Sequence, residues 1–152
     1  MGQVEQLMNH WLRHRRVLEE LLKTIPDEQI GYKPWDGAMA LGELAQHIAA
    51  STDMFVSLTK TGDQEIKPPE IADCRTMEEV RRVVTEYTEK TKGTFASLTD
   101  EELEIHYDSP HPNFRGPRKN LLLIAIDHEI HHKGQLFVYA RMIGRKDLPF
   151  FI

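Results

Sequence analysis

The sequence predicts an all-α fold, in which a single domain over residues 1–152 forms a four-helix bundle with long connections. Four stretches repeat apolar residues every three or four positions, as amphipathic helices of about 20 residues do. No run shows sustained period-two alternation with β-branched residues, so strands are hard to place. A chain of 152 residues is long enough for one domain with its own core. Four such helices are most simply packed as a bundle.

The first predicted helix covers about residues 4–23, and the second covers roughly residues 40–59. The apolar stripe of the first consists of Val4, Leu7, Met8, Trp11, Leu18, Leu21 and Leu22. One face of the second consists of Ala40, Leu44, His47, Ser51, Met54 and Leu58. Both sets follow the i, i+3, i+4 spacing that turns one helix face toward a core.

The third and fourth predicted helices carry clear start or stop signals. The third opens on a capping box, Thr76 followed by Glu79, and continues to about residue 98. The fourth covers about residues 120–143, with Asn120 as its N-cap and Gly144 as its stop signal. Because the fourth helix is apolar on more than one face, we expect it to be the most buried.

Three connections separate these helices, at residues 24–39, 60–75 and 99–119, and they are rich in Pro, Gly and Asp. About 15 extended residues span roughly 50 Å, which is more than the length of a 20-residue helix. Each connection can therefore run along the bundle, and neighbouring helices in the sequence need not be antiparallel.

Composition excludes several classes of function. The formal charge is −5, which argues against a surface that neutralises phosphates and hence against nucleic-acid binding. The longest apolar run, residues 121–126, is too short to span a membrane. A single cysteine, Cys74, excludes an intrachain disulfide, and the first residues lack the pattern of a signal peptide. We therefore expect a soluble cytoplasmic protein.

A pair of histidines on the fourth helix indicates a metal site. His128 and His132 lie four residues apart, so they face nearly the same way, one helical turn from each other. Their line is mostly apolar and places both rings toward the core, because it continues through Leu121, Ala125, Gln135, Leu136 and Tyr139. Two adjacent buried imidazoles are costly unless their nitrogens find partners, and one shared divalent cation supplies that partner. Two hydrogen-bonded core histidines are the alternative.

His47 adds a third inward imidazole from the second helix. A lone inward histidine is usually a satisfied core residue, but an inward pair on a second helix can converge with it in the centre of a bundle. Three neutral imidazoles leave at least one coordination position of a metal open, which is typical of catalytic rather than structural sites. The predicted metal ligands are His47, His128 and His132.

Acidic and basic residues flank this predicted triad. Glu129 and His131 lie to either side of the histidine pair and are the two candidates for a catalytic role, although a surface or interface role is favoured for His131. Glu43, one turn before His47, could orient that ring, act as a further ligand, or be a solvated acid.

The segment also matches the H-E-x-x-H motif of zinc proteases, in which Glu129 would be the general base. The longer metzincin pattern is missing, because Gln135 stands at its glycine position and Val138 at its third histidine. No strand-rich half is predicted that could hold an extended peptide. A protease is therefore the less favoured interpretation.

The remaining chemically active residues have less specific patterns. His10 and His14 form another i, i+4 pair, but arginines surround them, so solvated or capping roles are expected. His106 and His111 lie in the last long connection, which leads into the metal-bearing helix and could cover the mouth of the site. Cys74 is expected to be an inert thiol.

With the three histidines placed, the chain resembles the DinB/YfiT-like family, whose members are damage-inducible and expected to be metalloenzymes. The likeness is carried by KPWDGAMALGELAQHIAAS at 33–51, HEIHHKGQLFVYARMIG at 128–144 and the terminal LPFFI. The order H…H-x-x-x-H followed by a glutamine is its most specific part, and a lysine, Lys133, stands where the family often has arginine.

The resemblance implies properties that the spacing alone does not predict. It implies a bundle with up-down-down-up helix order, a homodimer, and a zinc or nickel ion on His47, His128 and His132. It also implies a small-molecule substrate, because related enzymes are S-transferases that use low-molecular-weight thiols such as bacillithiol or mycothiol.

The predicted function is therefore that of a metal-dependent enzyme in which the ion activates a thiol or a water, with thiol S-transfer as the first reading. A metal-dependent hydrolase of small esters or amides and a non-catalytic metal-binding stress protein are the alternatives.

Overall fold

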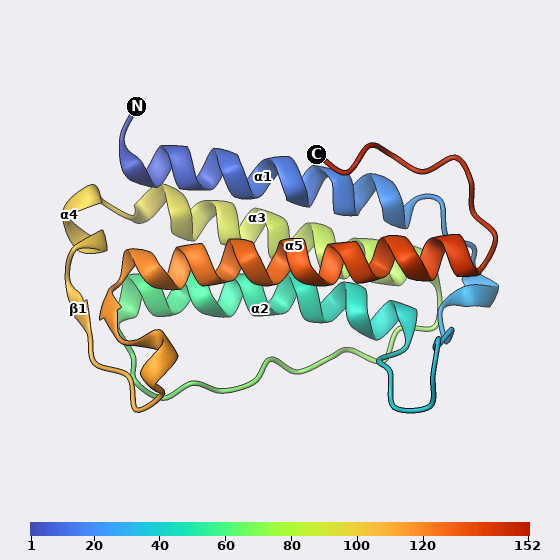
Figure 1. The fold of residues 1–152 in the computed structure, drawn as a ribbon. Coiled ribbons are helices and arrows are strands. Elements are labelled where there is room, and N and C mark those ends of the chain that lie inside the picture. Colours follow the sequence, from blue (N-terminus) through green and yellow to red (C-terminus); the bar gives the residue numbers. More distant parts are fainter.

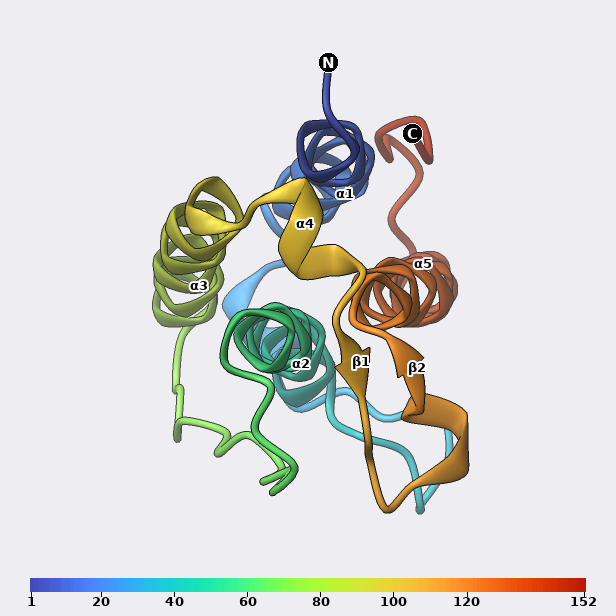
Figure 2. The same ribbon diagram turned by 90° about the vertical axis from the view of Figure 1, so that its left-hand side faces the viewer.

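The computed structural model describes residues 1–152 and confirms the all-α four-helix bundle (Figure 1). The long helices are α1 (Gln3–Leu22), α2 (Leu41–Thr61), α3 (Met77–Ser97) and α5 (Lys119–Met142). Seen along the bundle, α1 and α2 lie at opposite corners, and each packs against both α3 and α5 (Figure 2). None of these helices combines the length and the apolar character that a membrane span requires.

The helices follow the up-down-down-up order. In Figure 1, α1 and α5 run in one direction, whereas α2 and α3 both run in the other. Because α2 and α3 are parallel, residues 62–76 must return along the whole bundle before α3 can begin. This return explains why the second connection is long, and it makes α2 and α5 antiparallel neighbours.

The four long helices begin within one or two residues of their predicted first residues. The side chain of Thr76 accepts from the backbone N–H of Glu79 at 3.2 Å, and the Glu79 carboxylate accepts from the Thr76 N–H at 3.3 Å, which completes the expected capping box. Helix α5 begins one residue before Asn120, with Arg118 as its N-cap. Asn120 is therefore not the cap.

The last connection contains short strands that the sequence pattern did not place. This segment contains the short helix α4 (Asp100–Leu103) and a two-stranded antiparallel sheet of β1 (His106–Tyr107) and β2 (Gly116–Pro117). Strands of two residues are too short to show alternation, which is why the pattern missed them. Two single-turn 3-10 helices, η1 (Asp27–Gln29) and η2 (Pro112–Phe114), complete the structure.

The most buried helix is α2, which corrects the expectation for α5. Fifteen of the 21 residues of α2 are buried, compared with ten of the 24 residues of α5. Helix α5 keeps an outer face that includes the exposed side chains of Leu123, Ile130, Val138 and Met142. The apolar residues that suggested deep burial of α5 therefore partly line the surface.

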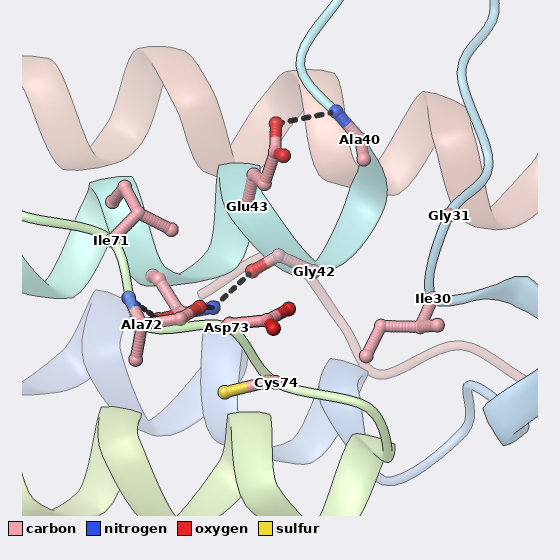
Figure 3. A pocket seen from close by; sticks show the side chains of 10 residues that line it. Ile30, Gly31, Ala40, Gly42, Glu43, Ile71, Ala72, Asp73 and Cys74 are labelled. Carbon is pink, nitrogen blue, oxygen red and sulfur yellow. Dashed lines mark hydrogen bonds between the residues drawn. The ribbon is translucent and has the colours of Figure 1, made fainter.

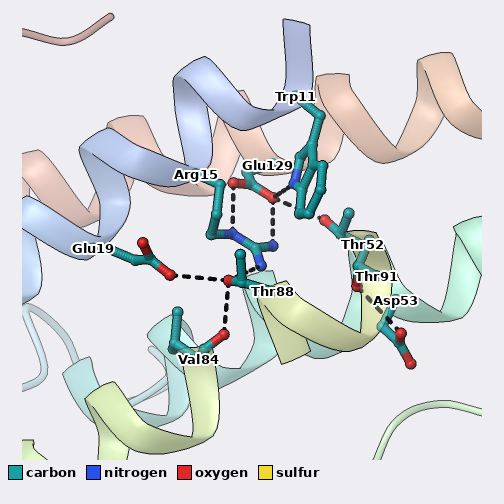
Figure 4. Close-up of polar contacts among 9 residues, drawn as sticks. All are labelled: Trp11, Arg15, Glu19, Thr52, Asp53, Val84, Thr88, Thr91 and Glu129. Atoms are coloured by element: carbon teal, nitrogen blue, oxygen red, sulfur yellow. Dashed lines mark hydrogen bonds and ion pairs between the residues drawn. The ribbon is translucent and has the colours of Figure 1, made fainter. Parts of the chain in front are cut away.

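A fully buried ion pair between Arg15 of α1 and Glu129 of α5 crosses the centre of the bundle (Figure 4). The guanidinium binds the carboxylate as a fork, with Nη2 at 2.6 Å from Oε1 and Nε at 2.9 Å from Oε2. A two-point contact of this kind fixes direction as well as distance.

Polar groups from the other helices complete this network. Trp11 Nε1 and Thr52 Oγ1 each donate to Glu129 Oε1 at 2.9 Å, and Arg15 Nη1 donates to Thr88 Oγ1 at 2.9 Å. The network therefore joins α1, α2, α3 and α5. Because Glu129 directly follows His128 in the chain, the network also fixes the rotation of α5 about its axis.

The last residues, 145–152, fold back between α1 and α5 (Figure 2). Lys133 of α5 is buried beneath them and donates hydrogen bonds to the carbonyl oxygen of Phe151 and to His14 Nδ1, the latter at 2.8 Å. His14 is only 5% exposed, so the expected solvated or capping role was wrong for this residue. It is a buried acceptor for Lys133.

Folding stability is expected to fall as pH is lowered from about 6.5 to 4, in part because of His14. Burial, followed by the positive charges of Lys133, His10 and Arg13, lowers the pKa of His14 from 6.5 to about 4. In this pH range the unfolded chain therefore binds a proton at His14 that the folded chain does not bind. This difference lowers the free energy of unfolding by at most about 3 kcal/mol. Urea denaturation at several pH values measures the loss.

His14→Asn is the matched variant, because asparagine can offer an acceptor near the position of Nδ1 but does not titrate in this range. The variant should lose less stability than the parent between pH 6.5 and 4. Parallel pH profiles for the two proteins would contradict the assignment.

Candidate metal centre

The three predicted histidines converge between the antiparallel helices α2 and α5. One ring nitrogen from each of His47, His128 and His132 lies within 4.8 Å of the others. The ring centroids are 4.9 Å apart for His47 and His128, 4.8 Å for His47 and His132, and 4.4 Å for His128 and His132. All three residues are half-buried, so the cluster borders on solvent.

His47 and His128 turn their Nε2 atoms toward each other. Nε2 of His47 and Nε2 of His128 are 3.1 Å apart. Two nitrogens that bind one zinc ion at a tetrahedral angle, each about 2.0–2.1 Å from it, lie about 3.3 Å apart. The spacing of this pair therefore fits a shared ion without rearrangement.

The second ring nitrogen of each histidine, Nδ1, has different neighbours in each of the three rings. Nδ1 of His132 lies 2.7 Å from Gln135 Oε1, and Nδ1 of His47 lies 3.4 Å from Ser51 Oγ. Nδ1 of His128 is buried and has no hydrogen-bond partner. In the two rings whose Nδ1 has a partner, Nε2 is left for the centre of the cluster, as metal-binding histidines require.

The cluster favours neutral imidazoles. Burial is the largest cause that lowers the pKa of each ring, and it brings that of His128 to about 4. The neighbouring rings lower the pKa further, because a proton on one ring repels a proton on the next. In His132 the hydrogen bond with Gln135 acts in the opposite direction and raises the pKa. Neutral imidazole is the form that binds a metal, so these nitrogens compete well with protons near neutral pH.

Three aromatic rings, those of Phe55, Phe114 and His111, pack in a row beside the cluster, on the side of the β1–β2 connection. The ring of Phe55 lies 6.3 Å from that of His128, and Phe114 packs edge-on against Phe55 at 5.5 Å. His111 stacks on Phe114 at 4.5 Å. The last long connection thus reaches the neighbourhood of the site, as the sequence suggested for His111, whereas His106 is exposed on β1.

Glu129 does not face the cluster. Both of its carboxylate oxygens bind Arg15, one of them also accepts from Trp11 and Thr52, and the side chain has no exposed surface (Figure 4). A carboxylate held in this way cannot exchange a proton with a substrate. Its candidacy as a catalytic base fails for this reason, and so does the protease reading of the motif.

His131 remains beside the cluster but outside it. Its ring is exposed, and its centroid lies 4.7 Å from that of His132. Its Nε2 lies 3.5 Å from Gln135 Nε2, so the two residues are linked at the edge of the site.

Glu43 caps its own helix instead of reaching His47. Its Oε2 accepts from the backbone N–H of Ala40 at 3.3 Å (Figure 3). It also lines a cavity of about 340 Å³ between the start of α2 and the connection 62–76. Gln46 holds that connection in place by exchanging two hydrogen bonds with the backbone of Ala72, at 3.0 and 3.2 Å. None of the three histidines lines this cavity.

Cys74 lines the same cavity and is half-buried (Figure 3). Burial, together with the nearby carboxylates of Glu79 and Asp73, raises the pKa of its thiol. It is therefore a protonated thiol at neutral pH, in agreement with the expected inert role.

Sequence reasoning missed Ser51 and Gln135 as partners of the histidines. Each follows its histidine by one helical turn, four residues after His47 and three residues after His132. Residues at these spacings are neighbours on a helix surface, so the signal was present in the sequence.

Comparison with known proteins identifies relatives along the whole chain. Residues 1–151 match the model of the DinB family. The uncharacterized protein YjoA of Bacillus subtilis is 36% identical over 152 residues, covering 99% of this chain and 97% of YjoA. The crystal structure of that DinB-like protein superposes with a TM-score of 0.83 at 34% identity, over 96% of this chain and 97% of the other.

Two more distant crystal structures share the fold. A DinB-like protein from Bacillus cereus superposes with a TM-score of 0.79 at 22% identity, over 99% of each chain. YfiT from Bacillus subtilis, described as a probable metal-dependent hydrolase with an unusual four-helix bundle topology, superposes with a TM-score of 0.72 at 16% identity, over 95% of this chain and 89% of YfiT. The whole-chain family match and the likeness to YjoA together show that the chain belongs to the DinB family.

Proposed function

We propose that the chain is a metal-dependent enzyme acting on a small molecule, with a divalent ion, zinc or nickel, held by His47, His128 and His132. The observation that carries this proposal is the convergence of three neutral imidazoles from two helices, with Nε2 of His47 and His128 only 3.1 Å apart. The description of YfiT as a probable metal-dependent hydrolase supports it at the level of the fold.

The residues around the cluster suit chemistry rather than a closed structural site. Three protein ligands leave at least one coordination position open, and the half-buried rings border on solvent. An ion bound there would lower the pKa of a thiol or water that it holds, so the nucleophile need not come from the protein. Phe55 beside His128, with Phe114 packed against it, makes one side of the site apolar.

Transfer of a low-molecular-weight thiol to an electrophile fits these residues best. No carboxylate makes a hydrogen bond to any of the three rings, and Glu129 is engaged by Arg15. The exposed ring of His131 lies beside the cluster, with its centroid 4.7 Å from that of His132. A thiol has only to lose one proton before it attacks, whereas hydrolysis of an ester or amide must also protonate a leaving group.

Hydrolysis of small esters or amides is the second candidate, and the description of YfiT is what favours it. The two candidates differ in whether a thiol is required. A non-catalytic metal-binding protein is a further outcome, in which metal binds but neither reaction is accelerated.

We expect tag-free protein loaded with zinc or nickel to accelerate conjugation of bacillithiol to monochlorobimane, and removal of the metal by a chelator to abolish the acceleration. The measurement is the fluorescence of the conjugate with and without metal and thiol. Cleavage of p-nitrophenyl acetate in the absence of thiol would favour the hydrolase. Metal-loaded protein that accelerates neither reaction would contradict both activities and leave a non-catalytic metal protein.

The homodimer implied by the family resemblance stays a proposal. Helix α5 exposes Leu123, Ile130, Val138 and Met142, and the tail adds Phe150 and Phe151. Exposed apolar residues of this number are what a second copy of the chain could cover.

A further inference from the structure

Gln135 makes the shortest hydrogen bond to any ring of the cluster. Its Oε1 lies 2.7 Å from Nδ1 of His132, at the short end of the range for N–H···O hydrogen bonds. The residue follows His132 by three positions on α5 and is half-buried. An amide oxygen only accepts, so in this contact the proton belongs to Nδ1 of the imidazole.

We propose that Gln135 is a positioning residue that holds His132 in the Nδ1–H tautomer and aims its Nε2 lone pair at the cluster. The inference rests on the proposed metal-binding function of the triad. A neutral imidazole carries one proton, and the nitrogen that binds the ion must be the one without it. By accepting from Nδ1, Gln135 selects the tautomer that can bind and holds the ring in place.

The other two rings have weaker support. The contact of His47 Nδ1 with Ser51 Oγ is longer, at 3.4 Å, and a hydroxyl can either donate or accept. His128 Nδ1 has no partner. Gln135 is therefore the one residue that both orients a ring of the triad closely and specifies its tautomer.

The amide nitrogen of Gln135 also has a side-chain partner. Gln135 Nε2 lies 3.5 Å from Nε2 of His131, which follows the i, i+4 spacing on the same helix face. The amide nitrogen of Gln135 is a donor and a ring nitrogen can accept from it, so this contact helps to keep the amide oxygen toward His132. The H-H-x-x-Q order in the sequence thus places three side chains in one chain of contacts, from the surface to the cluster.

The test combines two measurements on three variants. Gln135→Met keeps the length of the side chain but removes the acceptor. Gln135→Glu keeps an acceptor and should rescue binding, and Ser51→Ala removes the weaker contact to His47. The zinc dissociation constant is measured by competition with a chromophoric chelator, and nitrogen-15 NMR of the metal-free protein reports the tautomer of each histidine.

The dissociation constant of Gln135→Met should rise 10- to 100-fold, the usual range for loss of a residue that orients a metal ligand. The Ser51→Ala variant should change it less, and Gln135→Glu should bind at least as tightly as the parent. In the NMR spectrum, His132 of the parent should carry its proton on Nδ1, and Gln135→Met should show a mixture of tautomers. Unchanged thermal unfolding of metal-free Gln135→Met shows that the fold is intact.

The outcomes separate this inference from the proposed function. If the parent binds zinc and Gln135→Met binds it equally tightly, with the same His132 tautomer, the positioning role is wrong. If the parent binds no zinc but the tautomer of His132 depends on Gln135, the orientation by Gln135 stands and the metal function fails.

Discussion

Replacement of His132 by alanine is expected to abolish stoichiometric zinc or nickel binding. The variant leaves two imidazoles, His47 and His128, where the site is built from three. Loss of a residue that merely orients a ligand typically weakens binding 10- to 100-fold, so loss of the ligand itself should exceed that range. Inductively coupled plasma mass spectrometry of tag-free protein, dialysed after loading, measures the metal content.

His106→Ala is the matched control, because it removes an exposed histidine of the same chain that lies on β1, outside the cluster. This variant should retain the metal content of the parent. The ligand assignment is wrong if His132→Ala keeps a full equivalent of metal, or if the two variants lose metal to the same extent.

The long helices could be predicted because their signals are local. The stripes of α1 and α2 and the capping box at Thr76 depend on residues within one or two turns of one another. The two-residue strands β1 and β2 carry no such signal, and they form because residues 106–107 and 116–117 pair across the intervening residues 108–115. Sequence periodicity therefore specified the bundle but not the detail of its last connection.

The cluster of three histidines was predictable for a related reason. Helical spacing places His128 and His132 on one face of α5, and the apolar neighbours of His47 indicate that it faces inward from α2. The three rings then meet because α2 packs against α5, which is the one step that helical spacing does not predict. Glu129 was misjudged because its partner, Arg15, lies 114 residues away in the sequence. His14 was misjudged in the same way, since Lys133 is 119 residues away. The residues that local patterns misassigned are those whose burial depends on a distant partner.

Arg15→Met is expected to lower the free energy of unfolding by about 3–5 kcal/mol, because it leaves the Glu129 carboxylate buried without a counter-charge. Urea denaturation measures this loss. In a chain of this length the melting temperature should fall by about 2–4 °C for each kcal/mol.

Arg82→Met is the matched control for this variant. Its guanidinium makes an exposed contact with Glu78 on α3, at 3.8 Å, and exposed ion pairs contribute at most about 1 kcal/mol. The two substitutions delete the same chemical group, so the difference between them isolates the effect of burial.

The double variant Arg15→Met/Glu129→Gln tests whether the cost comes from the unpaired charge. The glutamine amide is neutral and keeps an oxygen that can accept from Trp11 and Thr52. It should be more stable than Arg15→Met alone by about 2 kcal/mol, because the second substitution removes the buried charge. If the double variant is no more stable than Arg15→Met alone, the stability of the bundle centre does not depend on charge pairing. The rotation of α5 that presents His128 and His132 to His47 must then be fixed by apolar packing instead.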